Sequence, residues 1–223
     1  MLSAPQRHLT FVVCFLVAPV LGLATTIDVN GGTLGSGQST SGSFSTTVDG
    51  GLFDVSGYYA GSETGGGPVT SIVVNATATY VGSTPLASAY SFSIDDIQNY
   101  TLSTLPTTAS YSENAGFGAD LGAGSELIAD LCYGPCTGLD VLPSLTFSAN
   151  GAQSTPSQAL SGLSNPLEAQ AKLTFDFGAG TTTGASITST PEPGGVIPIA
   201  AILVLGLGVP AIRRSRLLSK NMG

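Results

Sequence analysis

Residues 169–178, "AQAKLTFDFG", show the clearest alternation in this 223-residue chain. Apolar residues recur at every second position and polar residues fill the gaps: Ala171, Leu173, Phe175 and Phe177 against Lys172, Thr174 and Asp176. Successive side chains of a β-strand point to opposite faces, so this pattern predicts a strand with one buried and one solvated face. A strand of this kind belongs in an antiparallel sheet.

Similar segments recur along the chain, at residues 42–48, 51–59, 70–80, 89–95 and 144–149. Gly and Pro separate them, and Asp49-Gly50 between two apolar segments is a strong hairpin signal. Short helical turns are expected only at residues 125–131 and 156–163. The pattern predicts an all-β domain over residues 25–177, an antiparallel β-sandwich of jelly-roll or immunoglobulin-like order.

Charge is scarce and unevenly placed. Charged residues make up 9% of the chain, against about 25% in ordinary globular proteins. Between residues 25 and 190 there are thirteen acidic residues and one cation, Lys172, for a net charge of −12. A protein that binds nucleic acid needs clustered cations to neutralise phosphates, so we expect no nucleic-acid partner.

Residues 1–24 have the pattern of a secretory signal peptide. Arg7 and His8 precede an apolar run from Leu9 to Leu23, and small residues precede the expected cut between Ala24 and Thr25. We therefore expect the domain to leave the cytoplasm through the Sec export machinery.

A second apolar run, residues 196–212, carries no charge and would span roughly 25 Å as a helix at 1.5 Å per residue. That length suits a transmembrane helix. The cations that follow it lie in residues 213–220, and the positive-inside rule keeps such a tail in the cytoplasm. Both ends thus predict the same orientation, with the domain outside and the membrane as a partner of the C-terminal helix.

The C-terminal layout of Pro-Glu-Pro, one apolar span and an Arg-rich tail resembles the PEP-CTERM sorting signal over residues 191–216. The matching residues are Pro191, Glu192 and Pro193 in the box and Arg213, Arg214 and Arg216 in the tail. The resemblance implies recognition by an exosortase-type processing enzyme, and a membrane-anchored precursor later passed to the cell surface or extracellular matrix. A single-pass anchor that is never processed is the alternative. Residues 178–190, rich in Gly, Thr and Ser, are expected to be a flexible linker before the box, with a final edge strand over residues 185–189 as the alternative.

Catalytic chemistry is poorly supported. The sole histidine is His8 in the signal peptide, which removes His-based triads and His metal ligands from the exported domain. Cys132 and Cys136 are expected to form a disulfide in an oxidising compartment. We expect no cofactor and no metal site, although Asp95-Asp96 or residues 28–32 could contribute to a Ca²⁺ site.

Tyr58 and Tyr59 are the candidate ligand-binding residues, because one of two adjacent strand residues must face outward and a tyrosine ring can contact a sugar. The sequence predicts a non-enzymatic, exported surface protein with a structural or adhesive role in exopolysaccharide or biofilm. The alternatives are a polysaccharide- or Ca²⁺-binding module and a glycan-active enzyme that uses two carboxylates.

Overall fold

The computed structural model describes residues 24–37, 41–63, 70–102, 104–134 and 140–191, which are almost entirely β-structure in antiparallel pairs. Within these ranges, no helix reaches the length and apolar character needed to cross a bilayer. The predicted transmembrane segment, residues 196–212, lies outside the described residues.

Two sheets contain nearly all the strands. Sheet A runs in the order β10 (Asp140–Val141), β9 (Gly122–Tyr133), β14 (Leu167–Gly178), β6 (Tyr90–Tyr100), β1 (Ala24–Val29) and β2 (Gly32–Gly37), with β11 (Leu145–Phe147) also paired to β9. Sheet B runs β12 (Gly151–Ser154), β8 (Ser112–Phe117), β15 (Ser186–Pro191), β5 (Thr70–Tyr80), β4 (Phe53–Glu63) and β3 (Ser41–Val48). A small third sheet pairs β7 (Thr108–Ala109) with β13 (Gln158–Ala159).

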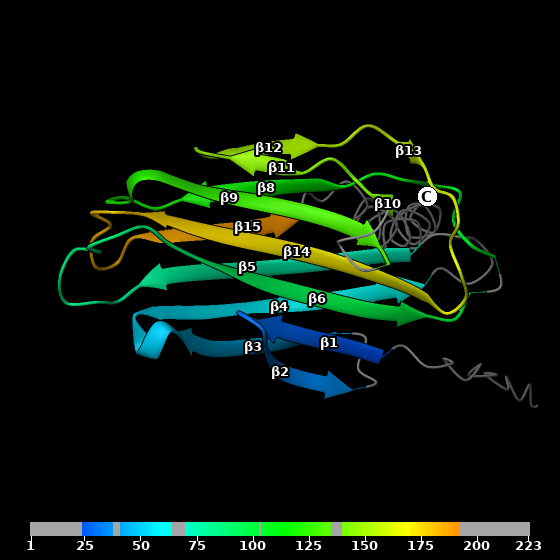
Figure 1. Ribbon diagram of the computed structural model, residues 1–223, viewed down its shortest axis with the longest axis horizontal. Helices are drawn as coiled ribbons and strands as arrows, with labels where there is room; N and C mark the ends of the chain where they lie inside the picture. Colours follow the sequence, from blue (N-terminus) through cyan, green and yellow to red (C-terminus); the bar gives the residue numbers. More distant parts are fainter. Residues whose placement is uncertain (1–23, 38–40, 64–69, 103, 135–139, 192–223) are drawn as a thin grey trace, which may run out of the picture.

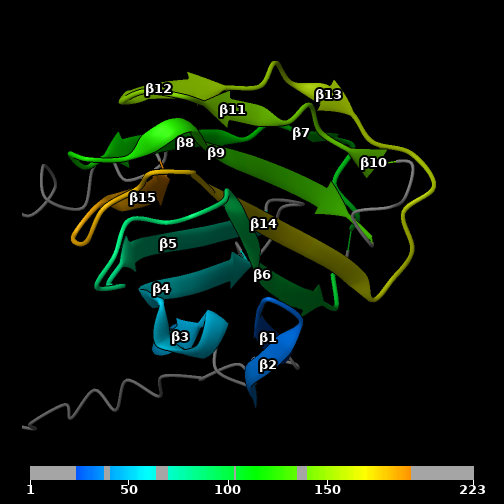
Figure 2. The same cartoon turned by 60° about the vertical axis from the view of Figure 1, so that its left-hand side comes forward.

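The chain crosses repeatedly between the two sheets, from β5 to β6, β6 to β8, β8 to β9, β11 to β12, β12 to β14 and β14 to β15. These crossings give the local orders β5-β15-β8-β12 in sheet B and β6-β14-β9-β11 in sheet A. Eight strands arranged in this way follow the order of a jelly roll. The hairpins β1–β2 and β3–β4 widen the two sheets on one side, at the lower end of Figure 2.

Aromatic rings join the two sheets in the centre of the core. Phe53 of sheet B is fully buried, and its ring centroid lies 4.9 Å from that of Phe177 and 5.5 Å from that of Phe92, both in sheet A. Tyr90 of sheet A stacks on Phe53 at 5.1 Å. Each of these rings occupies an inward position of an alternating strand, so the two-residue period of the sequence supplies the core.

The strongest strand predictions are confirmed. Residues 70–80 form β5, and residues 169–178 lie within β14, where Ala171, Leu173, Phe175 and Phe177 are buried. A short 3₁₀ turn, η1 (Asp49–Gly51), joins β3 to β4, and all three of its residues have positive φ. That conformation explains the Asp-Gly-Gly sequence, because Gly and Asp tolerate the left-handed region.

The two predicted helical turns are wrong. Residues 125–131 lie inside strand β9, where Leu127, Ala129 and Leu131 are buried and the residues between them are more exposed. The period of two outweighed the helix propensity of the segment. Residues 156–163 contain the two-residue strand β13 and no helix.

The predicted linker is also wrong in its second half. Residues 186–191 form β15, and this strand lies between β5 and β8 in the middle of sheet B. Ile187 and Ser189 point into the core and are fully buried. The sandwich therefore extends past residue 177 and includes Pro191, the first residue of the Pro-Glu-Pro box. Alternate residues of this segment are buried, as in a strand. The segment is rich in Ser and Thr, so its sequence does not show that alternation.

We expect Phe53→Ala to lower the free energy of unfolding by about 3–5 kcal/mol, because it empties the ring position that joins the sheets. Chemical denaturation followed by circular dichroism measures the change. Tyr58→Ala on the same strand removes an exposed ring and should stay within about 0.5 kcal/mol of the parent. Equal losses in the two variants would contradict a core centred on Phe53.

Candidate functional site

The outer face of sheet B is rich in hydroxyl groups, and we call it the hydroxyl face. One row crosses four neighbouring strands in register and consists of Ser45, Ser56, Thr77 and Thr188. The Thr77 and Thr188 hydroxyls lie 3.1 Å apart and share a hydrogen bond. Asp54 is the one charged side chain among those the structure describes on this face. The face is therefore nearly neutral although the domain is strongly acidic.

Tyr58 stands on the hydroxyl face with 44% of its surface exposed. It lies in register with Ser43 on one side and Asn75 on the other. Tyr59 turns to the inner face, as adjacent strand residues must, and its ring lies over Gly42: a Cβ added there would sit 2.6 Å from the Tyr59 Oη. Of the two candidate ligand-binding residues, only Tyr58 presents an open ring.

The outer face of sheet A has the opposite character. A matching row across β1, β6, β14 and β9 consists of Asp28, Asp95, Lys172 and Asp130. Lys172 is in register with one carboxylate on either side. Asp95 also accepts two hydrogen bonds, from Ser93 Oγ at 2.9 Å and from Gln170 Nε2 at 2.8 Å. Charge is thus concentrated on one side of the sandwich.

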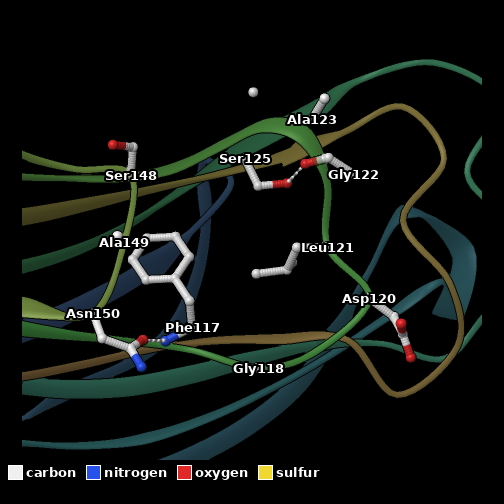
Figure 3. A pocket seen from close by; sticks show the side chains of 11 residues that line it. Phe117, Gly118, Asp120, Leu121, Gly122, Ala123, Ser125, Ser148, Ala149 and Asn150 are labelled. Carbon is white, nitrogen blue, oxygen red and sulfur yellow. Dashed lines mark hydrogen bonds between the residues drawn. The ribbon is translucent and has the colours of Figure 1, made fainter.

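A pocket of about 550 Å³ opens at one end of the sandwich, and we call it the end pocket. It lies between the loop that connects β8 to β9 and the β11–β12 turn, and Figure 3 shows the Phe117 ring and the Leu121 side chain between these two segments. Its volume falls in the range of ligand sites, roughly 300–1,000 Å³. The lining residues are Phe117, Gly118, Asp120, Leu121, Gly122, Ala123, Gly124, Ser125, Ser148, Ala149 and Asn150.

Hydrogen bonds fix the walls of the end pocket. The Phe117 backbone N–H donates to Asn150 Oδ1 at 2.5 Å and joins the two segments. Ser125 Oγ donates to the Gly122 carbonyl at 2.7 Å and accepts from the Gly178 N–H at 2.8 Å. An aromatic ring between polar loops suits a small polar ligand, but the Asp120 carboxylate points away from the ring (Figure 3).

Two acidic side chains lie inside the core. Asp96 is fully buried, and its Oδ2 accepts from Gln98 Nε2 at 2.8 Å, while Gln98 Oε1 accepts from the Tyr100 hydroxyl at 2.8 Å. Asp96 Oδ1 has no hydrogen-bond partner. Burial raises the pKa of Asp96 to about 7, and the hydrogen bond from Gln98 opposes that rise. Gly61 faces this group, where a Cβ would overlap Gln98.

Glu113 is the second buried acid. Its carboxylate accepts from the Tyr111 hydroxyl at 2.5 Å and from Ser189 Oγ at 2.6 Å. Burial raises the pKa of Glu113 to about 7, and the hydrogen bonds from Ser189 and Tyr111 oppose it. Burial and the neighbouring Glu113 both raise the pKa of Tyr111. Ser189 ties this acid to β15, the strand that sequence composition had assigned to the linker.

The structure separates Asp95 from Asp96, two of the residues considered as a possible contribution to a Ca²⁺ site. Asp96 faces the core and Asp95 the outer face, so the two adjacent carboxylates cannot share an ion. Asp28 lies in register with Asp95, but the described residues contain no group of three His, Cys, Asp or Glu side chains placed to hold a metal. All three carboxylates lie on β1 and β6, two neighbouring strands of sheet A.

Other predicted residues lie at the limits of the description. Thr25, after the predicted cleavage point, is 3% exposed within β1. Cys132 is buried and disulfide-bonded, but Cys136 lies outside the described residues, so the pairing stays a prediction. Pro191 ends β15, and the other sorting-signal residues, from Glu192 onward, also lie outside them.

Sequence reasoning missed the end pocket, the buried acids and the segregation of charge. The first depends on the approach of the β8–β9 and β11–β12 turns, which no local pattern reveals. The buried acids had a usable signal: Asp96 and Gln98 continue the inward register of Phe92 and Ile94 along residues 90–100. Extending that register would have placed both polar side chains in the core.

No family model matches the chain, and no curated protein matches it. Among solved structures, it is similar to that of TmCBM61 in complex with β-1,4-galactotriose, with a TM-score of 0.32 and 10% sequence identity. The similarity covers 69% of this chain and 86% of the other. A likeness this weak carries no conclusion about what the present chain binds.

The buried acids predict that the protein is more stable in mild acid. The pKa of each acid is raised to about 7 in the folded state, above the unfolded values near 4, so the folded state binds more protons between these limits. The free energy of unfolding should therefore fall as pH rises from about 4 to about 7, with each acid contributing a slope of roughly 1.4 kcal/mol per pH unit.

Asp96→Asn tests this directly, because the amide keeps an oxygen to accept from Gln98. Urea denaturation across pH 4–8 should show a shallower pH dependence in this variant and higher stability than the parent at pH 8. Asp95→Asn, one residue away on the outer face, is the matched control and should keep the parent slope. If the stability of Asp96→Asn depended on pH as steeply as that of the parent, Asp96 would not be a source of the pH dependence.

Proposed function

We propose that this chain is a non-catalytic, exported surface protein that works within extracellular polysaccharide and contacts neutral glycan through the hydroxyl face. The observation that carries the binding part is the combination of the exposed Tyr58 ring with rows of Ser and Thr on a nearly uncharged sheet. A ring can cover the apolar face of a sugar while hydroxyls exchange hydrogen bonds with its edges. An outer face that continues across four neighbouring strands suits an extended polymer better than a small molecule.

The location rests on the two ends of the chain. The signal-peptide pattern of residues 1–24 supports export, and the box, apolar span and basic tail of residues 191–216 support sorting by an exosortase-type enzyme. On this proposal the precursor is held in the membrane by residues 196–212. The processed domain then reaches the cell surface or the extracellular matrix.

The carboxylates favour a binding role over glycan hydrolysis. Hydrolysis needs two carboxyl groups about 5–9.5 Å apart across the scissile bond. Three pockets formed by the described residues, the end pocket among them, each have one carboxylate in their lining: Asp120, Asp49 and Glu168. Asp96 and Glu113 lie in the core, where a polysaccharide chain has no access to them.

Glycan binding is tested by affinity retention on immobilised neutral glucan and galactan, with anionic alginate as a third probe. We expect retention on a neutral polymer and none on alginate, because the domain carries a charge of −12. Tyr58→Ala should weaken retention about fivefold, which corresponds to about 1 kcal/mol for one ring contact.

Tyr58→Phe keeps the ring and should retain most of the binding. Phe117→Ala, in the end pocket, is the matched aromatic control and should behave like the parent. Loss of retention in Phe117→Ala but not in Tyr58→Ala would move the binding site to the end pocket. No retention on either neutral polymer would refute this part of the proposal.

Sorting is tested by mass spectrometry of the intact protein recovered from the cell surface. We expect the chain to begin at Thr25 and to end near the Pro-Glu-Pro box. Glu192→Ala should keep the C-terminal residues attached and the protein in the membrane fraction. A surface protein that still contains residues 196–223 would instead support the unprocessed anchor.

A further inference from the structure

The sandwich has four edges within the described residues, and three of them are poorly suited to pairing. Sheet B ends at one side in β12, which has four residues, and the corresponding edge of sheet A consists of β10 and β11, with two and three residues. The β2 edge of sheet A has a register shift against β1 between Ile27 and Asp28. Short edge strands and bulges are devices that prevent edge-to-edge association.

The β3 edge of sheet B has neither device. All eight of its residues pair with β4 without a register shift. The strand contains no proline and no charged residue, although lysine and proline are the usual protection of an exposed edge. At 3.2–3.4 Å per residue, the seven residues from Gly42 to Val48 offer an edge of roughly 23 Å for backbone hydrogen bonds.

The uncharged β3 edge is a place where a second copy of this chain can bind despite the negative charge of both copies. With −12 on each domain, two copies repel one another in most orientations, above all through the carboxylate rows of sheet A. Along β3 the exposed residues are Ser41, Ser43, Ser45 and Thr47, so two copies can approach there without bringing carboxylates together. Phe44 is half-buried at the same edge and packs against the core on one side, which leaves apolar surface for a partner strand to cover.

We propose that two copies of the protein pair through β3 in antiparallel fashion, so that sheet B continues across a two-fold axis. The contact is isologous: the same strand serves both partners, and Ser45 lies near the axis. The two hydroxyl faces then form one surface of twice the width. This inference goes beyond the proposed glycan contact and does not depend on it.

Sedimentation equilibrium of the exported protein over a concentration series tests the pairing in the absence of glycan. We expect a reversible monomer–dimer equilibrium. Ser45→Lys brings like charges together at the axis and should weaken dimerisation at least about tenfold. The matched control is Ser56→Lys, the same change on the same face in the residue that pairs with Ser45 from β4. It should dimerise like the parent.

Cysteine cross-linking gives a second readout that does not rely on loss of binding. Ser45→Cys should form a disulfide-linked dimer on mild oxidation, and Ser56→Cys should not. A parent that stays monomeric at every concentration overturns the proposal. The proposal is also overturned if the parent dimerises, Ser45→Lys leaves that dimer intact and Ser45→Cys yields no cross-link. Association would then use another surface. If Ser45→Lys fails to fold, the cross-linking result decides alone.

Discussion

The packing of two inward-facing rows of side chains, centred on Phe53, is the interaction on which the rest of this structure depends. Phe53 contacts Phe92 and Phe177 of the opposite sheet, and these contacts set how the sheets lie on one another. Because side chains alternate along every strand, fixing the inner rows also fixes what each outer face displays. The hydroxyl face and the carboxylate row are therefore consequences of the same register that builds the core.

The two outer faces divide the chemistry of the molecule. Carboxylates gather on sheet A around Lys172, while sheet B displays Ser and Thr with Tyr58 among them. Hydroxyl groups let the outer face of sheet B bind water without carrying charge. This face can therefore approach another acidic molecule without the repulsion that carboxylates would cause. The low fraction of charged residues in the chain is therefore explained by the outer face of sheet B, which is polar but nearly uncharged.

Much of the fold could be predicted from the sequence where alternation was strict, as in residues 70–80 and 169–178, because period two follows from backbone geometry. Prediction failed at residues 125–131, where good helix formers occupy a strand, and at residues 186–191, where small polar residues hide an inward row. Sheet order, the end pocket and the buried Glu113 depend on contacts between distant strands. Of the candidate site, Tyr58 was found from local pattern alone.

The position of β15 determines how the domain would bear mechanical load. Hydrogen bonds to β5 on one side and β8 on the other hold this strand, and it ends at Pro191, where the box begins. A force applied at residue 191 along the strand would act on both ladders in shear, so several hydrogen bonds would resist together. A terminal strand at the rim of a sheet would have only one such ladder. The domain would thus resist tension applied at residue 191 better than a domain whose last strand lay at a sheet edge.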